Sequence, residues 1–256
     1  MSLIKTPEEI KVLREGGHKL ASVLSRIADA VRPGISTADL DTLAEDLIRK
    51  EGGESAFKGY KAFGAKTAYP GTVCTSINEE VVHGIPSKTR ILAEGDIIGL
   101  DIGMKYGGLY TDTAVTVPVG TIDSAARELI FVTNSALTEG IRAICAGAHV
   151  GDIGNAIETY VRSKGMYGIV KDLVGHGVGH AVHEDPPIPN YRTKGRGPSL
   201  VPGMVLALEP MLTLGAAGVM IAKDHWTWST RDGSLSAHFE HTILVTKEGA
   251  EILTKE

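Results

Sequence analysis

The chain has 256 residues and a formal net charge of -5 at pH 7, with 43% hydrophobic and 22% charged residues. This is the composition of an ordinary globular protein, so a disordered chain is excluded, and the negative charge gives no electrostatic support for a stable nucleic-acid partner. Its two cysteines, Cys74 and Cys145, form neither a disulfide framework nor a zinc-binding spacing. Because we find no signal peptide and no apolar run that could span a bilayer, we expect a cytoplasmic protein without a membrane partner.

Two helices are predicted before residue 55. Thr6-Pro7-Glu8-Glu9 has the pattern of a capping box, and apolar residues then recur at helical spacing until Pro33-Gly34 ends the helix. Ser36-Thr37 begins a second helix, which Gly52-Gly53 ends. Residues 55–118 are rich in glycine, threonine and β-branched residues, which predicts strands and turns.

The second part of the chain repeats this order. Helical periodicity returns over residues 124–144 and 153–161, and strands and loops follow. We therefore predict an α+β fold in a single domain, residues 1–256, with two similar halves of about 1–120 and 121–256 that share one sheet. The proline-rich residues 186–202 predict a long irregular surface loop.

A predicted β-hairpin brings two aspartates together. If Tyr106-Gly107 forms a two-residue turn, Asp101 lies directly opposite Asp112. Alternation puts Ile98 and Ile102 on the reverse side of the sheet. Facing carboxylates repel each other unless a cation or a shared proton compensates, so this pair predicts a site for one of these.

Three histidines within eight residues form a second candidate cluster. His176 and His180 have the spacing of a helical zinc motif, but the glycines around them favour an extended segment. Glu209 stands at the end of an apolar strand and Glu240 precedes another apolar run. Each glutamate alone is typical of a solvated strand residue.

Five motifs follow one another in a defined order. They are Ile77-Asn78-Glu79-Glu80-Val81-Val82-His83-Gly84-Ile85-Pro86, the two-aspartate hairpin, Gly175-His176-Gly177-Val178-Gly179, Val201-Pro202-Gly203-Met204 leading to Glu209-Pro210, and Ser236-Ala237-His238-Phe239-Glu240-His241-Thr242. With these motifs the sequence resembles type I methionine aminopeptidases over essentially its whole length. The resemblance implies the pita-bread α+β fold, in which two pseudo-symmetric helix-strand halves surround a central, mostly antiparallel sheet with a dimetal centre.

The resemblance also implies the metal ligands. They would be Asp101, Asp112, His176, Glu209 and Glu240. Asp112 and Glu240 would bridge two divalent ions, Asp101 would bind one ion through both oxygens, and His176 with Glu209 would complete the other site. Four carboxylates and one imidazole suit Mn, Fe, Co or Zn and not a thiolate zinc site. Glu209 would in addition move a proton from water to the leaving amine.

Further residues of the implied site are two histidines and an apolar pocket. His83 and His183 would be catalytic and substrate-binding groups near the scissile carbonyl, whereas His180 matches no essential role. The methionine pocket would consist of Tyr69, Cys74, Trp226 and Phe63, with Val182 beside it. The sequence departs from some bacterial members near Phe63, Lys66 and Val182, which leaves the fine shape of this pocket open.

The activity implied is hydrolytic removal of the N-terminal methionine from nascent proteins and peptides whose second residue is small. A proline-specific aminopeptidase or prolidase of the same fold would share the ligands, but its usual extra N-terminal domain has no counterpart before the helix at Thr6. A non-catalytic peptide-binding member is the second alternative, disfavoured by the intact ligand set. The resemblance suggests a monomer and leaves transient contact with the ribosome open.

Overall fold

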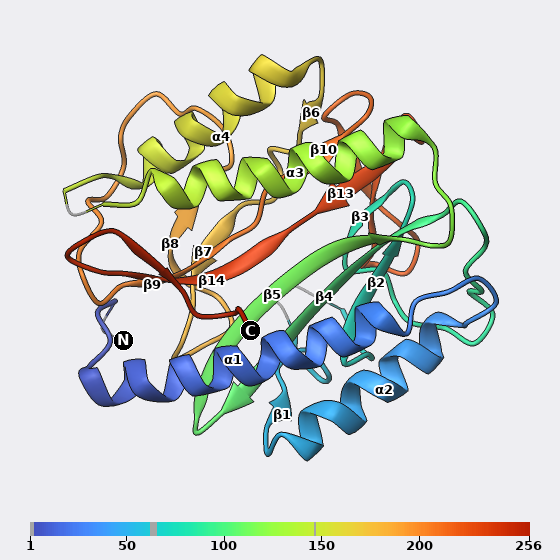
Figure 1. Cartoon of the computed structure of the whole chain (residues 1–256), viewed down its shortest axis with the longest axis horizontal. Coiled ribbons are helices and arrows are strands. Elements are labelled where there is room, and N and C mark those ends of the chain that lie inside the picture. Colours follow the sequence, from blue (N-terminus) through green and yellow to red (C-terminus); the bar gives the residue numbers. More distant parts are fainter. Residues whose placement is uncertain (1–2, 62–65, 146) are drawn as a thin grey trace.

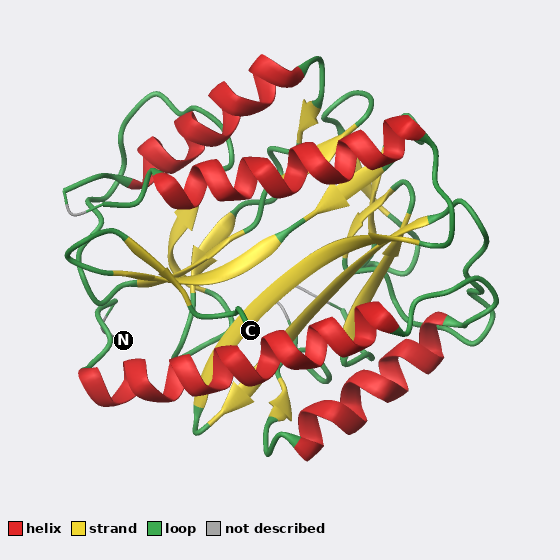
Figure 2. Cartoon of the chain, viewed as in Figure 1, coloured by secondary structure: helices red, strands yellow, loops and turns green. Residues whose placement is uncertain are grey.

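The helices lie on one side of a curled β-sheet in the computed structural model, which describes residues 3–61, 66–145 and 147–256 (Figures 1 and 2). They are α1 (Pro7–Asp29), α2 (Thr37–Lys50), α3 (Ser124–Arg142) and α4 (Val150–Lys164). The predicted capping box begins α1, because Thr6 Oγ1 accepts from the Glu9 N–H at 3.2 Å and Glu9 Oε2 accepts from the Thr6 N–H at 2.7 Å. None of the described helices is both long and apolar enough to cross a membrane.

The main sheet is antiparallel at every described pair of strands. Its strand order is β1-β4-β5-β14-β9-β7-β8, and β2 and β15 add to β4 and β14. The bounds are β1 (Glu54–Ser55), β2 (Val73–Ile77), β4 (Ile97–Tyr106), β5 (Leu109–Pro118), β7 (Gly175–Gly177), β8 (Glu184–Ile188), β9 (Val205–Leu208), β14 (Glu240–Val245) and β15 (Ala250–Ile252). The α+β prediction is confirmed.

Two short sheets complete the described strands. One has the order β13 (Ser236–His238), β10 (Met211–Thr213) and β6 (Gly168–Ile169). The other has the order β11 (Val219–Ile221), β12 (Trp228–Thr230) and β3 (Glu80–Val82). Along the chain a helix pair is followed by strands twice, as expected (Figure 1). The division of one domain into residues 1–120 and 121–256 stays a prediction.

Alternation along the strands gives the main sheet one apolar and one polar face. Ile98, Leu100 and Ile102 of β4 are buried in the core with residues of α1 and α2. Leu206 and Ile243 belong to the core beneath α3 and α4. The residues between these positions point to the opposite face, which holds the two aspartates and, on β9 and β14, also Val205 and Leu244, which pack against Leu13 of α1.

The predicted turn of the aspartate hairpin is wrong by one residue. Tyr106 pairs with Leu109, so the turn is Gly107-Gly108, with φ of 56° and 87°. A type I′ turn requires positive φ at both central residues, and two glycines meet this requirement where Tyr106 would not. Asp101 is consequently opposite Ala114, and Asp112 is opposite Gly103. The two aspartates are offset along the hairpin but share one face.

The prediction of an irregular loop from residue 186 is also partly wrong. Pro186 and Pro187 belong to β8, which lies at the end of the main sheet. Proline has no N–H to donate and is tolerated on such an edge strand.

Candidate metal centre

Two neighbouring rows of residues cross the polar face of the sheet. The first row is Cys74 on β2, Asp101 on β4, Ala114 on β5 and Glu240 on β14. The second is Gly103, Asp112, Thr242, Ala207 and His176, in which Thr242 Oγ1 accepts from the Asp112 N–H at 2.9 Å. Ala114 separates Asp101 from Glu240 in the first row, and Gly103 beside Asp112 lets Phe57 approach the sheet, because a Cβ atom there would lie 2.7 Å from the Phe57 ring. Antiparallel register thus brings together residues that are far apart in the sequence.

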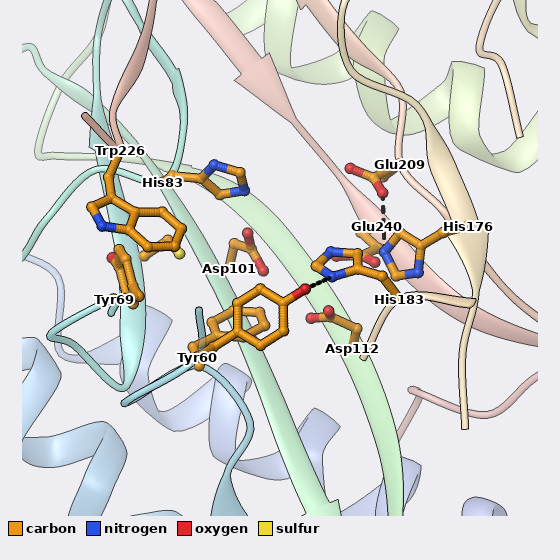
Figure 3. A pocket seen from close by; sticks show the side chains of 12 residues that line it. Tyr60, Tyr69, His83, Asp101, Asp112, His176, His183, Glu209, Trp226 and Glu240 are labelled. Atoms are coloured by element: carbon orange, nitrogen blue, oxygen red, sulfur yellow. Dashed lines mark hydrogen bonds and ion pairs between the residues drawn. The ribbon is translucent and has the colours of Figure 1, made fainter. Parts of the chain in front are cut away.

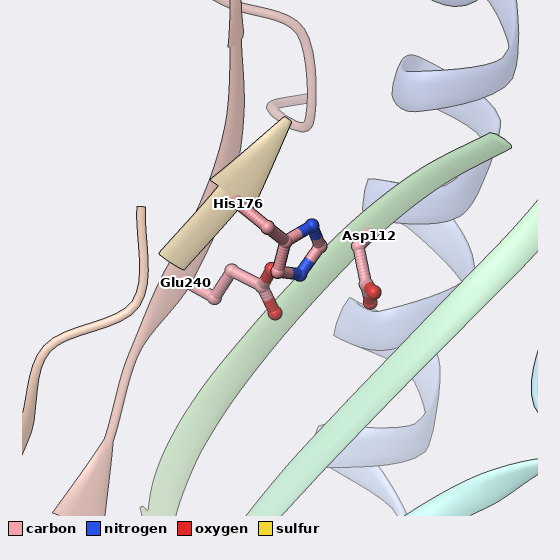
Figure 4. Close-up of side chains that lie close together, drawn as sticks. All are labelled: Asp112, His176 and Glu240. Carbon is pink, nitrogen blue, oxygen red and sulfur yellow. The ribbon is translucent and has the colours of Figure 1, made fainter. Parts of the chain in front are cut away.

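All five predicted ligands line one pocket with a volume of about 90 Å³ (Figure 3). One ligand atom each of Asp112, His176 and Glu240 lies within 4.8 Å of the others (Figure 4). Glu209 follows β9, and its Oε1 is 3.4 Å from Nε2 of His176. The expectation that Glu209 or Glu240 could be a solvated strand residue is wrong, because both line the pocket and Glu240 is only 2% exposed.

Ionising the carboxyl groups of this pocket costs free energy when no cation is present. Burial, followed by repulsion from neighbouring carboxylates, raises the pKa of Asp101, Glu209 and Glu240 well above the ordinary range. Burial raises the pKa of Asp112 to about 7. Four carboxyl groups that share one enclosed space can all be ionised only if a positive charge compensates.

Two buried oxygens supply an independent indication of a cation site. Asp101 Oδ1 and Glu240 Oε1 have no hydrogen-bond partner among the described residues. Buried polar atoms in native proteins are generally satisfied, so unpaired carboxylate oxygens that face one pocket fit direct bonds to an ion. The residues present therefore fit divalent metal ions with mainly oxygen ligands.

His176 is prepared to act as a neutral ligand. Its Nδ1 lies 2.9 Å from the Gly177 carbonyl oxygen, which can only accept, so the ring hydrogen is on Nδ1. Nε2, on the side of Glu209, then keeps a free lone pair. Burial lowers the pKa of His176 to about 3, so the ring is neutral at pH 7.

Both remaining predicted histidines also line the pocket. His83 follows β3 with φ of 60°, and burial lowers its pKa to about 4. The His183 ring is 4.4 Å from the His176 ring, centroid to centroid. His180 is not among the described residues that line the pocket.

Tyr69 and Trp226 lie at the end of the pocket away from His176 (Figure 3) and belong to an apolar cluster. Tyr69, Cys74, Val182 and Trp226 pack together, and the Tyr69 and Trp226 rings meet edge to face at 5.3 Å (Figure 3). Lys66 is exposed, and Phe63 lies outside the described residues.

Three residues of the site were not predicted from the sequence. Phe57 and Tyr60 line the pocket, and the Tyr60 hydroxyl is 2.8 Å from His183 Nδ1. His238 Nε2, which is buried, lies 3.8 Å from Glu209 Oε2. His238 lies two residues before Glu240, and residues at this spacing in a strand share a face, so the sequence could have indicated it. The segment around Phe57 has no comparable pattern.

The sequence profile of metallopeptidase family M24 matches residues 11–247. The chain belongs to this family. It is 47% identical over 254 residues to methionine aminopeptidase of Clostridium acetobutylicum, which covers 99% of both chains. It is 44% identical over 255 residues to methionine aminopeptidase 1 of Bacillus subtilis, which covers 100% of both. These full-length matches agree with the resemblance that the motifs indicate.

Solved structures of family M24 share the architecture. The crystal structure of methionine aminopeptidase from Thermotoga maritima matches with a TM-score of 0.93 and 45% identity, over 99% of each chain. The chain accordingly has the pita-bread α+β fold of these metallopeptidases, and its polar sheet face carries the candidate metal centre.

Proposed function

We propose that the chain is a metal-dependent aminopeptidase that removes the N-terminal methionine of nascent proteins and peptides when the second residue is small. The observation that carries this proposal is the shape of one pocket, in which a cluster of carboxylates borders an apolar end formed by Tyr69, Cys74 and Trp226. Such a pocket can hold an apolar side chain while its backbone lies over the carboxylates.

The donor set would bind two divalent ions of Mn, Fe, Co or Zn. The proposed ligands are Asp101, Asp112, His176, Glu209 and Glu240. When bound, such ions would lower the pKa of a water molecule and polarise the scissile carbonyl group. The unpaired oxygens of Asp101 and Glu240 and the neutral ring of His176 support this assignment.

Glu209 would carry the proton. Burial and the charges of Asp101 and Asp112 raise the pKa of its carboxyl group, which favours the protonated form through which a proton carrier passes. Its Oε1 lies 3.4 Å from His176 Nε2 and its Oε2 lies 3.8 Å from His238 Nε2, so the carboxyl group is at the ligand cluster. From there it would accept a proton from the attacking water and give it to the leaving amine.

His183 and His83 would act on the substrate. The Tyr60 hydroxyl can donate to His183 Nδ1, and the hydrogen of the neutral ring would then be on Nε2, from which it would be donated to the scissile carbonyl oxygen as negative charge develops there. His83 lies on the side of Trp226, at 6.3 Å between ring centroids, and would bind the substrate next to the apolar end.

The apolar end would select methionine. A flexible thioether fits irregular space and makes favourable contacts with aromatic edges, which Tyr69 and Trp226 supply. Cys74 is opposite Asp101 in the sheet, so the methionine side chain would lie directly beside the proposed metal ligands.

Two peptides discriminate between the candidate functions. Metal-loaded protein is incubated with Met-Ala-Ser and with Ala-Pro-Ser, and the products are followed by mass spectrometry. We expect the first peptide to release free methionine and the second to remain intact. A third peptide, Met-Leu-Ser, should release methionine much more slowly than Met-Ala-Ser. Cleavage of the proline peptide alone would favour a proline-specific enzyme, and cleavage of neither under Mn, Co, Fe and Zn would favour a peptide-binding role.

We further propose that the chain acts as a monomer in the cytoplasm, with at most transient contact with the ribosome. One chain supplies all five proposed ligands, so the site needs no second copy. Nascent methionine-initiated chains also emerge in that compartment. Sedimentation at micromolar concentration tests the first point, since a stable dimer would contradict it.

A further inference from the structure

A buried lysine outside the pocket has no place in the proposed reaction. Lys5 precedes α1, and its backbone N–H donates to the Gly203 carbonyl at 2.8 Å. Its side chain is 0% exposed, which is rare for lysine unless the charge is paired. The pairing partner is Glu184, whose Oε2 is 2.6 Å from Lys5 Nζ. Glu184 directly follows His183.

Glu184 closes the turn that contains His183. Its Oε1 accepts from the backbone N–H groups of His180 and of Ala181, the latter at 2.9 Å. Its Oε2 accepts a hydrogen bond from Lys5 Nζ. The carboxylate of Glu184, the residue after His183, thus contacts both the start of the turn and the N-terminal residue Lys5.

His180 joins the same group of charges. Lys5 Nζ is 3.2 Å from His180 Nδ1, and His180 Nε2 is 2.7 Å from Glu9 Oε1. Lysine can only donate, so Nδ1 accepts from it and Nε2 donates to the carboxylate of Glu9. This Glu9 is also the capping-box residue of α1. We call Lys5, Glu9, His180 and Glu184 the Lys5 network.

A glycine makes the close approach of Lys5 possible. Gly179 has φ of 138°, and a Cβ atom there would lie 2.4 Å from Cε of Lys5. The lysine stem therefore crosses the backbone of the segment between His176 and His183.

We propose that Lys5 is a positioning residue: through the Lys5 network it holds the turn of residues 180–184 so that the His183 ring packs edge to face against the His176 ring at the pocket. Without the ammonium group, the carboxylate of Glu184, whose side chain is 9% exposed, would be buried without a counter-charge. The turn would rearrange to hydrate it, and His183 would move with its neighbour. The catalytic consequence rests on the proposed function.

Lys5→Met tests the inference, since it keeps the length of the stem and removes the charge. We expect kcat for Met-Ala-Ser with Mn-loaded protein to fall about 10- to 100-fold with little change in KM, because a misplaced catalytic group costs about this much. The amide hydrogens of His180 and Ala181 should exchange at least about 10-fold faster, while amides of the central strands are unchanged.

Two further variants complete the experiment. Lys5→Met/Glu184→Gln removes both charges and keeps an amide oxygen for the two N–H groups, so we expect kcat within about threefold of the unmodified chain. Lys19→Met removes the partly exposed lysine that pairs with Glu51 at 3.3 Å and should change neither measurement. Should Lys5→Met not fold, Lys5→Gln is measured in its place with the same expectations.

The results separate the possible failures. A folded Lys5→Met chain with unchanged kcat, or with exchange accelerated equally everywhere, overturns the inference, as does a fall in kcat without faster exchange at Ala181. If the unmodified chain releases no methionine but exchange in the turn still accelerates in the variant, the proposed function fails and the structural role of Lys5 stands.

Discussion

Removing metal from the chain should make its stability fall as the pH rises. In the folded chain the pKa of Asp112 is about 7, against an ordinary value of 3.8. An acid with a raised folded pKa contributes stability that is fully present below the ordinary value and lost as the pH rises through the folded one. The other three carboxyl groups of the pocket have raised pKa values and act in the same direction.

The size of this effect follows from the Asp112 value. Between pH 5 and pH 8 this one group should remove about 2–3 kcal/mol of the free energy of unfolding. For a chain of this length that corresponds to a fall in Tm of about 5–10 °C. Asp112→Asn carries no charge and should lose the share of this pH dependence that Asp112 contributes, while the other three carboxyl groups keep theirs. At pH 8 the metal-free variant should therefore be more stable than the metal-free unmodified chain, although it lacks a proposed ligand.

Thermal unfolding with a chelator, at several pH values from 5 to 8, measures the effect. Adding Mn²⁺ should raise Tm most at high pH, where the carboxylates are ionised, and Asp112→Asn should lose much of this response. Asp46→Asn, which removes an exposed carboxylate, should behave like the unmodified chain. A constant Tm of the metal-free chain from pH 5 to 8 would contradict the raised pKa values of these carboxyl groups. So would a Tm of Asp112→Asn that falls with pH as steeply as the Tm of the unmodified chain.

Three other substitutions have defined outcomes. Ala114→Leu fills the space between the two carboxylates of its row and should weaken Mn²⁺ binding in calorimetry by at least about 10-fold; unchanged affinity would contradict the proposed position of the ions. Tyr60→Phe removes the hydroxyl next to His183 and should lower kcat about 10-fold, with the ¹⁵N signals of the His183 ring changing tautomer; identical signals would argue against this role. Trp226→Ala should raise KM for Met-Ala-Ser more than it lowers kcat, whereas an effect on kcat alone would place methionine elsewhere.

The local signals of the fold could be predicted from the sequence. The capping boxes at Thr6 and Ser36 begin α1 and α2 at the expected residues, because these patterns depend only on neighbouring side chains. Strand alternation correctly put Ile98 and Ile102 on the face opposite Asp101, where they are buried. The hairpin register was wrong because the prediction did not require positive φ at both turn positions, which only Gly107-Gly108 meets without strain.

The candidate site could be predicted only in part. Counting residues back from the predicted turn indicated, without the family resemblance, that Asp101 and Asp112 share a face. They are not directly opposite each other. Glu209 and Glu240 came from the family resemblance, because no local pattern says that β9 and β14 lie side by side. Tyr60 and Lys5 were missed for the same reason, since each acts through a residue more than a hundred positions away.

The most direct test of the account is the dependence of methionine release on bound metal. Metal-free protein is titrated with Mn²⁺, and bound ions per chain by native mass spectrometry and the initial rate of methionine release from Met-Ala-Ser are measured on the same samples. We expect no release without metal, release that rises as up to two ions bind, and loss of both ion binding and release in Asp112→Ala. Undiminished release in the presence of chelator, or from an Asp112→Ala chain, would contradict it.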